Sequence, residues 1–418
     1  MKLFGLFNIY TMKEDELARY ISEGFETAKA GNAIEPYMMA KPYAANGILP
    51  ARSHYAFGWI AYYALHQAAD HDILLRKQIL ATYLRLNVPR PHKLHSMVLT
   101  EAIRLYRNAR EAAFGKKKSE AEAFSIVRFC GLWGLENLRE GDWRRKAFEG
   151  KTLGSTAEKL ITVYVDELED TSAVASAGFR AVLDKALATF PDSAMLLMQR
   201  AAIHASEGAP DEARLLLKRA LLTAPGKFFL WQRLAMLISK DADIRLHVAL
   251  LYKALKSPGQ EQFKGRIRLA LADALISRGM QGEALWELER VRRVYEANGW
   301  NLPAAYRNAS KKIADGTSPV DPEPIYRRLE SLADDEVYAS LPEVRARKTY
   351  HKSPEERGDG KGFGRQAVAW RVTDGGGSHY WVQPHRFGIG ADLPLGTEVL
   401  IRVHQGKAVR LRLAPDPA

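Results

Sequence analysis

The side chains with the clearest capacity for chemistry lie near the end of the chain, where apolar and polar residues alternate. Alternation places successive side chains on opposite faces of a strand. One face collects a tryptophan among cationic and polar residues: Arg371, His379, Trp381, Gln383, Arg402, His404, Arg410 and Arg412. Tryptophan among arginines is the composition that stacks bases and follows phosphates on single-stranded nucleic acid. Trp381 is therefore expected to stack a base, with His379 and Gln383 beside it, while the four arginines contact phosphates.

Short strands must position these side chains. The alternating segments predict strands at 366–373, 379–383, 397–404 and 407–413, joined by glycine turns at Asp374–Gly377 and Gln405–Gly406. The opposite face is apolar and is predicted to form the core: Val368, Trp370, Val372, Tyr380, Val382, Val399, Ile401, Val403, Val409, Leu411 and Leu413. Short strands with tight turns predict a small barrel of the oligonucleotide-binding type. The alternative is that Trp381 packs on the preceding linker or helices and the arginines are merely solvated.

Two stretches carry a family resemblance. Thr373–His385, followed by Leu393–Val403, resembles the later strands of a cold-shock domain, with a glycine turn, an aromatic-Val-His motif and a Leu-x-x-Gly-x-x-Val motif. Trp381 takes the place of the stacking aromatic, and Gln383 that of the histidine. Lys361-Gly-Phe-Gly resembles the family's first ribonucleoprotein motif but lies too far upstream, and no first strand is evident before it. The resemblance implies binding of single-stranded RNA or DNA.

A repeat precedes this region. Pro191, Pro225 and Pro258 lie 34 and 33 residues apart, and each ends a helical segment with alanines at regular places. A period in the low thirties is typical of stacked helical hairpins. Glycines are expected where one helix turns into the next, namely Gly208, Gly279 and Gly282. The pattern resembles the tetratricopeptide repeat, with departures at His204, Ile238 and His247, and this resemblance implies a concave surface that holds a protein partner.

The predicted fold class is therefore mainly α: a tetratricopeptide-like α-solenoid followed by a small C-terminal β-barrel resembling OB and cold-shock domains. The predicted domains are a divergent helical domain at 1–165, helical repeats at 166–340, a flexible basic linker at 341–364 and the barrel at 365–418. In the first domain, the aromatic stripe of Ser53–His66 has helical spacing and is expected to be core. A last helix is expected to begin near Pro322.

Composition limits the partners and the compartment. The net charge is +12, and the residues from Val344 onward carry 13 Lys and Arg against 7 Asp and Glu, a surplus of 6 and half of the total. Such a surface favours polyanions. The single cysteine excludes an internal disulfide, so a reducing cytoplasm is expected. No apolar run in the sequence is long enough to span a membrane, so no membrane-spanning segment is expected. The oligomeric state stays open.

Signals for catalysis are scarce. The sequence lacks a phosphate-binding loop, a His-Glu-x-x-His motif and a nucleophile elbow, and no cofactor or metal is predicted. Cys130, within an apolar helical segment, is expected to be structural. His66, Asp70 and His71 share part of a helical face, a weak metal signal, and a capped helix end is the favoured interpretation. An enzyme hidden in these helices would need polar groups that converge in a pocket between His54 and Asp72.

We therefore expect a non-enzymatic adaptor that holds a protein on the helical repeats and single-stranded nucleic acid, RNA in preference, on the barrel. The alternative is a pure protein scaffold or an accessory subunit of a larger complex, in which the barrel docks a protein and binds no nucleic acid. Salt-sensitive binding to an unstructured oligonucleotide would distinguish the nucleic-acid-binding adaptor from the pure protein scaffold.

Overall fold

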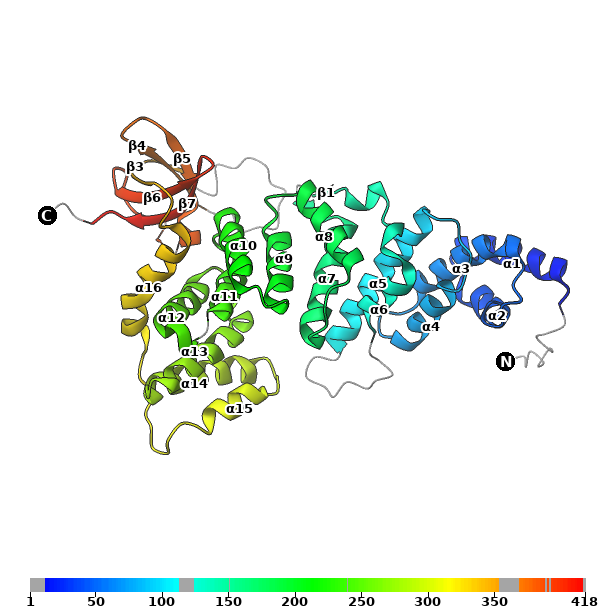
Figure 1. Cartoon of the computed structure of the whole chain (residues 1–418), viewed down its shortest axis with the longest axis horizontal. Coiled ribbons are helices and arrows are strands. Elements are labelled where there is room, and N and C mark those ends of the chain that lie inside the picture. Colours follow the sequence, from blue (N-terminus) through cyan, green and yellow to red (C-terminus); the bar gives the residue numbers. More distant parts are fainter. Residues whose placement is uncertain are drawn as a thin grey trace. The chain divides into compact units, whose positions relative to one another are not determined.

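The computed structural model describes residues 12–112, 124–149, 151–238, 240–352, 368–387, 389–390 and 392–415. The chain forms two compact units, Met1–Thr189 and Phe190–Ala418. The described residues are mainly helical, with a curled antiparallel sheet at the C-terminal end of the second unit (Figure 1). None of the helices in these ranges is long and apolar enough to cross a membrane.

The first unit contains eight α-helices in its described part, with one short hairpin that the sequence did not predict. The helices are α1 (Glu14–Lys29), α2 (Ile34–Ala45), α3 (His54–Gln67), α4 (Ile73–Tyr83), α5 (Lys93–Ala112), α6 (Ile126–Trp133), α7 (Thr156–Thr171) and α8 (Ala177–Thr189), and the hairpin is β1 (Lys146–Phe148) with β2 (Lys151–Leu153). Helix α7 continues through the boundary predicted at 165/166, because its buried face extends to Leu168. The division between the units follows Thr189 instead.

Helix α3 only partly matches the expectation of a buried aromatic stripe. Phe57 is fully buried, but Tyr55 is 42% exposed and Trp59 is half-buried. The rings of Tyr55, Trp59 and Tyr62 contact one another in edge-to-face pairs along the outer side of the helix. The prediction of core was therefore wrong for most of these aromatic residues, because small and aliphatic residues such as Ile60 and Ala64 fill the buried face.

The second unit begins with three helical hairpins. They are α9 (Ala194–Ser206) with α10 (Pro210–Thr223), α11 (Phe228–Leu237) with α12 (Lys240–Lys256), and α13 (Gly265–Ser277) with α14 (Gln281–Ala297). Gly208 and Gly279 have positive φ angles of 78° and 73° at two of the turns, as expected of glycine there. Gly282 lies instead in the first turn of α14. Helices α15 (Ala304–Ser310) and α16 (Glu323–Tyr338) follow.

The sheet consists of β3 (Glu343–Lys352), β4 (Ala369–Asp374), β5 (His379–Val382), β6 (Glu398–His404) and β7 (Lys407–Leu413) in the order β5-β4-β3-β6-β7. Every neighbouring pair is antiparallel. The first part of β3 pairs with β6 and the later part pairs with β4, with an irregularity between Lys348 and Tyr350. Because β5 and β7 also come into contact, the sheet curls into a half-barrel.

The core of the half-barrel confirms the predicted faces of β4, β5 and β6. Its fully buried members include Trp370, Val372, Val382, Val399 and Ile401. Leu413 was predicted to belong to this core, and that prediction was wrong, because the side chain is 48% exposed at the end of the last strand.

Residues 343–352 form the central strand of the sheet, so the prediction of a flexible linker at 341–364 was wrong for this part. Val344 and Ala346 pack in the core and Lys348 is also buried. The Lys348 ammonium lies over the Trp370 ring, 4.5 Å from its centroid, and donates a hydrogen bond to the carbonyl of Leu393. The Lys361-Gly-Phe-Gly motif lies outside the described residues.

Candidate nucleic-acid interface

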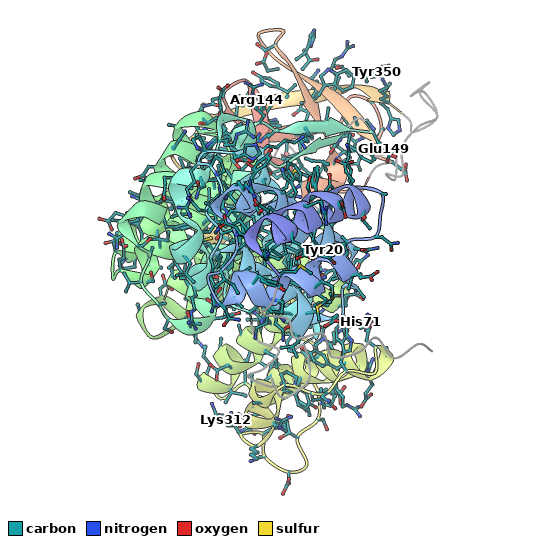
Figure 2. All side chains as sticks on the ribbon, turned by 90° about the vertical axis from the view of Figure 1, so that its right-hand side faces the viewer. Tyr20, His71, Arg144, Glu149, Lys312 and Tyr350 are labelled. Carbon is teal, nitrogen blue, oxygen red and sulfur yellow. The ribbon has the colours of Figure 1, made fainter. Side chains whose placement is uncertain are left out.

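A row of three side chains crosses the outer face of the sheet. Strand register places Tyr350 of β3 opposite Arg371 of β4, and Arg371 opposite Trp381 of β5. Trp381 is 57% exposed and Tyr350 39% exposed, and Figure 2 shows Tyr350 at the surface. The two rings meet edge to face with 6.0 Å between centroids. The row is therefore an accessible aromatic platform.

Arg371 supplies the charge in this row. Its guanidinium carbon lies 5.6 Å from the centroid of the Tyr350 ring, within the range of a cation–π interaction. Among the described residues it forms no ion pair with a carboxylate, and its buried Nε atom has no hydrogen-bond partner. A half-buried guanidinium held against a ring and lacking an acidic partner favours an anion close to this face.

A second polar row lies beside the first. The Thr349 hydroxyl contacts the Thr373 hydroxyl at 2.9 Å, and the Thr373 hydroxyl contacts Nδ1 of His379 at 2.9 Å. His379 is exposed. His379 and Trp381 are two positions apart on β5 and therefore lie on the same face of the sheet. The hydrogen bond to Thr373 orients the imidazole of His379 on that face. His379 therefore lies where the sequence predicted it.

The remaining three arginines of the predicted interface bind acidic or carbonyl groups of the protein itself. Arg410 forms an ion pair with Asp334 of α16 at 2.7 Å. Arg412 donates to both carboxylate oxygens of Glu343, at 2.7 and 2.9 Å. Arg402 donates to the carbonyls of Ala339 and Leu341 just after α16. Arg410 and Arg402 therefore attach the sheet to α16, and Arg412 is held within the sheet by β3, whereas the sequence placed all three on an open face with Arg371.

The arginines around Glu343 change the pKa of its carboxyl group. Its partial burial favours the neutral acid, but the hydrogen bond from Arg412 and the charges of Arg412, Arg402 and Arg410 outweigh this and lower its pKa. Glu343 is therefore ionised and compensates cationic charge that the sequence had assigned to phosphate.

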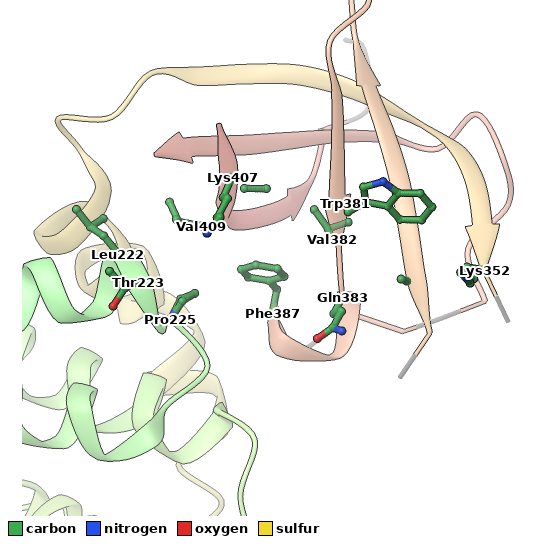
Figure 3. A pocket seen from close by; sticks show the side chains of 12 residues that line it. Leu222, Thr223, Pro225, Lys352, Trp381, Val382, Gln383, Phe387, Lys407 and Val409 are labelled. Atoms are coloured by element: carbon green, nitrogen blue, oxygen red, sulfur yellow. The ribbon is translucent and has the colours of Figure 1, made fainter. Parts of the chain in front are cut away.

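Gln383 and His404, the other two polar residues of the predicted interface, lie outside the row of Tyr350, Arg371 and Trp381. Gln383 follows β5 and lines a cavity together with Trp381 (Figure 3). His404 lies half-buried at the β6–β7 turn, opposite the exposed Lys407 in the strand register. Neither residue pairs with a carboxylate among the described residues.

Sequence reasoning missed Tyr350 and Lys352, which β3 brings to the same side of the sheet as Trp381. Both lay in the segment interpreted as linker. A weak signal was present in the alternation of Val344 and Ala346 with Arg345 and Arg347, but the arginines at the outward positions suggested a solvated run.

The polar cluster of the first unit does not support a metal site. The Glu101 carboxylate accepts hydrogen bonds from buried Arg76 at 2.8 Å and from Nδ1 of His66 at 2.9 Å. Asp70 pairs with Arg76 at 2.9 Å and with Arg104 at 2.6 Å. His71 lies apart at the surface (Figure 2). No group of three metal-binding side chains occurs within the described residues.

The favoured interpretation of that segment is confirmed by its helix cap. The Asp72 carboxylate accepts a hydrogen bond from the amide of Leu75 at 3.0 Å and begins α4. Cys130 is buried in α6, and burial raises the pKa of its thiol far above the ordinary value, so it is structural as expected.

Comparison with known proteins adds one match. Residues 196–333 match the model of a domain of unknown function, DUF7017. The match covers the helices from α9 to most of α16 and ends before the sheet. No curated protein matches the chain.

Proposed function

We propose that this protein is a non-enzymatic adaptor whose C-terminal sheet binds single-stranded nucleic acid, RNA in preference, and whose helical hairpins bind a protein. The row of Tyr350, Arg371 and Trp381 across three adjacent strands is the observation that carries the proposal. Aromatic faces stack bases of any sequence, and a guanidinium between them attracts the backbone phosphates.

The connectivity of the sheet supports an oligonucleotide-binding barrel. In that class, the face of the second and third strands binds the strand of nucleic acid. Here β3 is the long first strand that pairs on both sides, so β4 and β5 correspond to the second and third strands. Arg371 and Trp381 lie on these two strands, and the resemblance to cold-shock domains gives Trp381 the place of the stacking aromatic.

The protein-binding role rests on the hairpins. Their first helices begin at residues 194, 228 and 265, which are 34 and 37 residues apart and close to the 34 and 33 residues between the three prolines, and this supports a tetratricopeptide-like solenoid. Leu215 of α10 and Met236 of α11 are large apolar side chains on their exposed sides. Surfaces of this kind hold extended or helical segments of a partner. A reducing compartment such as the cytoplasm fits the single buried thiol.

Fluorescence anisotropy of a labelled, unstructured RNA oligonucleotide with the full-length protein tests the nucleic-acid role. Removing Trp381 with Trp381→Ala is expected to cost about 1–3 kcal/mol, the typical contribution of one stacked base, which weakens binding by roughly 5- to 150-fold. The matched control is Leu395→Ala, which removes another exposed side chain of the same sheet region. Equal affinity of the Trp381→Ala variant and the unmodified protein would contradict the proposal.

The internal pairing of Arg402, Arg410 and Arg412 favours a second candidate, a protein scaffold or accessory subunit. Much of the basic charge of the sheet is compensated within the fold. Capture of partners from native lysate, with and without nuclease, distinguishes the two. A stable protein partner that survives nuclease and high salt, with no oligonucleotide binding by the purified protein, would select the scaffold.

A further inference from the structure

A cavity of about 390 Å³ opens next to Trp381, within the second unit (Figure 3). The sheet supplies one side and the corner between α10 and α11 supplies the other. The lining residues are Leu222, Thr223 and Pro225 from the helices and Lys352, Ala369, Trp381, Val382, Gln383, Phe387, Lys407, Ala408 and Val409 from the sheet. Its volume lies at the lower end of the range of small-molecule sites.

The lining combines three kinds of group. Trp381 and Phe387 offer aromatic surfaces, and the Gln383 amide offers both a hydrogen-bond donor and an acceptor. Lys352 from β3 and Lys407 from β7 bring two ammonium groups to the cavity from different strands. None of the twelve lining residues is acidic. An aromatic wall, an amide and two cations suit a base joined to a phosphate.

The two lysines of the cavity are not paired with carboxylates, in contrast to Arg410 and Arg412 of the same sheet. Among the described residues, neither Lys352 nor Lys407 forms an ion pair. Arg410 and Arg412, on the same strand as Lys407, pair with Asp334 and Glu343 instead. The charge on this strand is therefore available to a ligand only at its first residue, which borders the cavity.

We propose that the cavity binds the terminal nucleotide of the single strand, together with a terminal phosphate. Trp381 belongs both to the outer platform and to the cavity lining, so a strand stacked on the platform continues into the cavity. The helical corner at Leu222–Pro225 lines the opposite side of the cavity, and a volume of about 390 Å³ suits a small ligand such as one nucleotide. This inference rests on the proposed function, since the strand must first lie on the platform.

The experiment measures affinities of the full-length protein for one short RNA with 5′-phosphate, 3′-phosphate or hydroxyl ends, and for a nucleoside monophosphate. One phosphorylated end is expected to bind about tenfold more tightly than the hydroxyl form, because a charge-assisted contact is added. Thr223→Trp fills the cavity from the helical side and Lys407→Ala removes one ammonium group. Both are expected to abolish this preference.

Lys227→Ala, an exposed lysine outside the cavity, is the matched control and is expected to keep the preference. Equal binding of all three RNA forms by the unmodified protein, or a preference that survives both Thr223→Trp and Lys407→Ala, would overturn the inference while the proposed function stands. No binding of any RNA form would remove the proposed function and the inference together. Binding of the monophosphate alone, without any end preference in RNA, would assign the cavity to free nucleotides and also overturn it.

Discussion

The two groups of arginines on the sheet differ in what surrounds them. Arg371 lies against the Tyr350 ring and forms no ion pair among the described residues, whereas Arg412 is held by both oxygens of Glu343. A guanidinium that is already paired with a carboxylate contributes little binding free energy to a phosphate, because the existing ion pair must first be broken. Only the first kind of arginine can release counterions from a nucleic acid when it binds.

Substitution of each arginine by glutamine separates these roles. Arg371→Gln is expected to reduce the slope of log affinity against log salt by about 0.7, the contribution of one contact to single-stranded nucleic acid. Arg412→Gln, the matched control on the same sheet, is expected to leave the slope unchanged. Salt titrations of RNA binding by anisotropy measure both. A smaller slope for Arg412→Gln together with an unchanged slope for Arg371→Gln would contradict this assignment.

The buried thiol of Cys130 gives a separate expectation at this scale. Because burial keeps the thiol protonated and out of contact with solvent, the native protein should not react with a thiol reagent at neutral pH. One equivalent should react once denaturant unfolds the chain, and this can be followed by absorbance. Rapid stoichiometric labelling of the native protein would show that the Cys130 thiol is accessible to solvent and would contradict a purely structural role for this residue.

Helix α16 is the element that positions the sheet within the second unit. Its Glu336 pairs with Arg214 of α10 at 2.6 Å and with Lys218 at 2.7 Å. Its Asp334 pairs with Lys253 of α12 at 2.9 Å and with Arg410 of β7 at 2.7 Å. Tyr338, fully buried, packs edge to face on Trp231. The helix thus contacts the hairpins on one side and the sheet on the other.

A double-mutant cycle measures the strength of this attachment. Asp334→Ala leaves Arg410 and Lys253 without their buried partner and is expected to cost about 3 kcal/mol of unfolding free energy. In the background of Arg410→Ala the same change is expected to cost at least 0.5 kcal/mol less, because neighbouring residues couple. Chemical denaturation of the four proteins gives the values. Strict additivity would show that the pair does not hold the sheet.

Local sequence patterns predicted most strands of the sheet and their buried faces. They missed the features that depend on residues distant in the sequence. Alternation correctly separated exposed Trp381 from buried Trp370 and Val382, because face assignment needs only the neighbours in sequence. Strand β3 was missed since a lysine occupies its third inward position. Lys348 is tolerated there because the Leu393 carbonyl, the Trp370 ring and Nδ1 of His351 lie close to its ammonium group. The pairing of Arg410 with α16 depends on a residue 76 positions away, 410 − 334, which no local pattern shows.

At the scale of the whole chain, ion pairs shape the response of both units to acid. In the first unit, burial raises the pKa of Glu158, but bonds from Arg145 and the Ser155 amide lower it below the ordinary value of 4.5. In the second unit, burial of Glu336 is likewise outweighed by Arg214 and Lys218. Glu287 is the opposite case, because burial dominates and its pKa is raised.

These shifts predict that stability falls as the pH drops below about 4.5, the ordinary pKa of a glutamate. A carboxyl with a lowered folded pKa binds fewer protons in the folded than in the unfolded chain, so its contribution is complete above 4.5 and is lost as the pH passes its folded pKa. The raised pKa of Glu287 acts against this, but the lowered group is larger: Asp70, Glu140, Glu158, Glu323, Glu336, Glu343, Asp374 and Glu398.

Thermal unfolding of the full-length protein at pH 7, 5, 4 and 3 checks this expectation, with the steepest decline of Tm below pH 4.5. Glu336→Gln removes one of the more buried contributors and is expected to lower Tm at pH 7 while making the decline below pH 4.5 shallower, since a glutamine does not titrate. Arg19→Gln, at an exposed i,i+4 pair with Glu23, is the control expected to leave the profile unchanged. A Tm that stays constant to pH 3, or rises, would mean that these carboxylates do not stabilise the folded chain through their ion pairs.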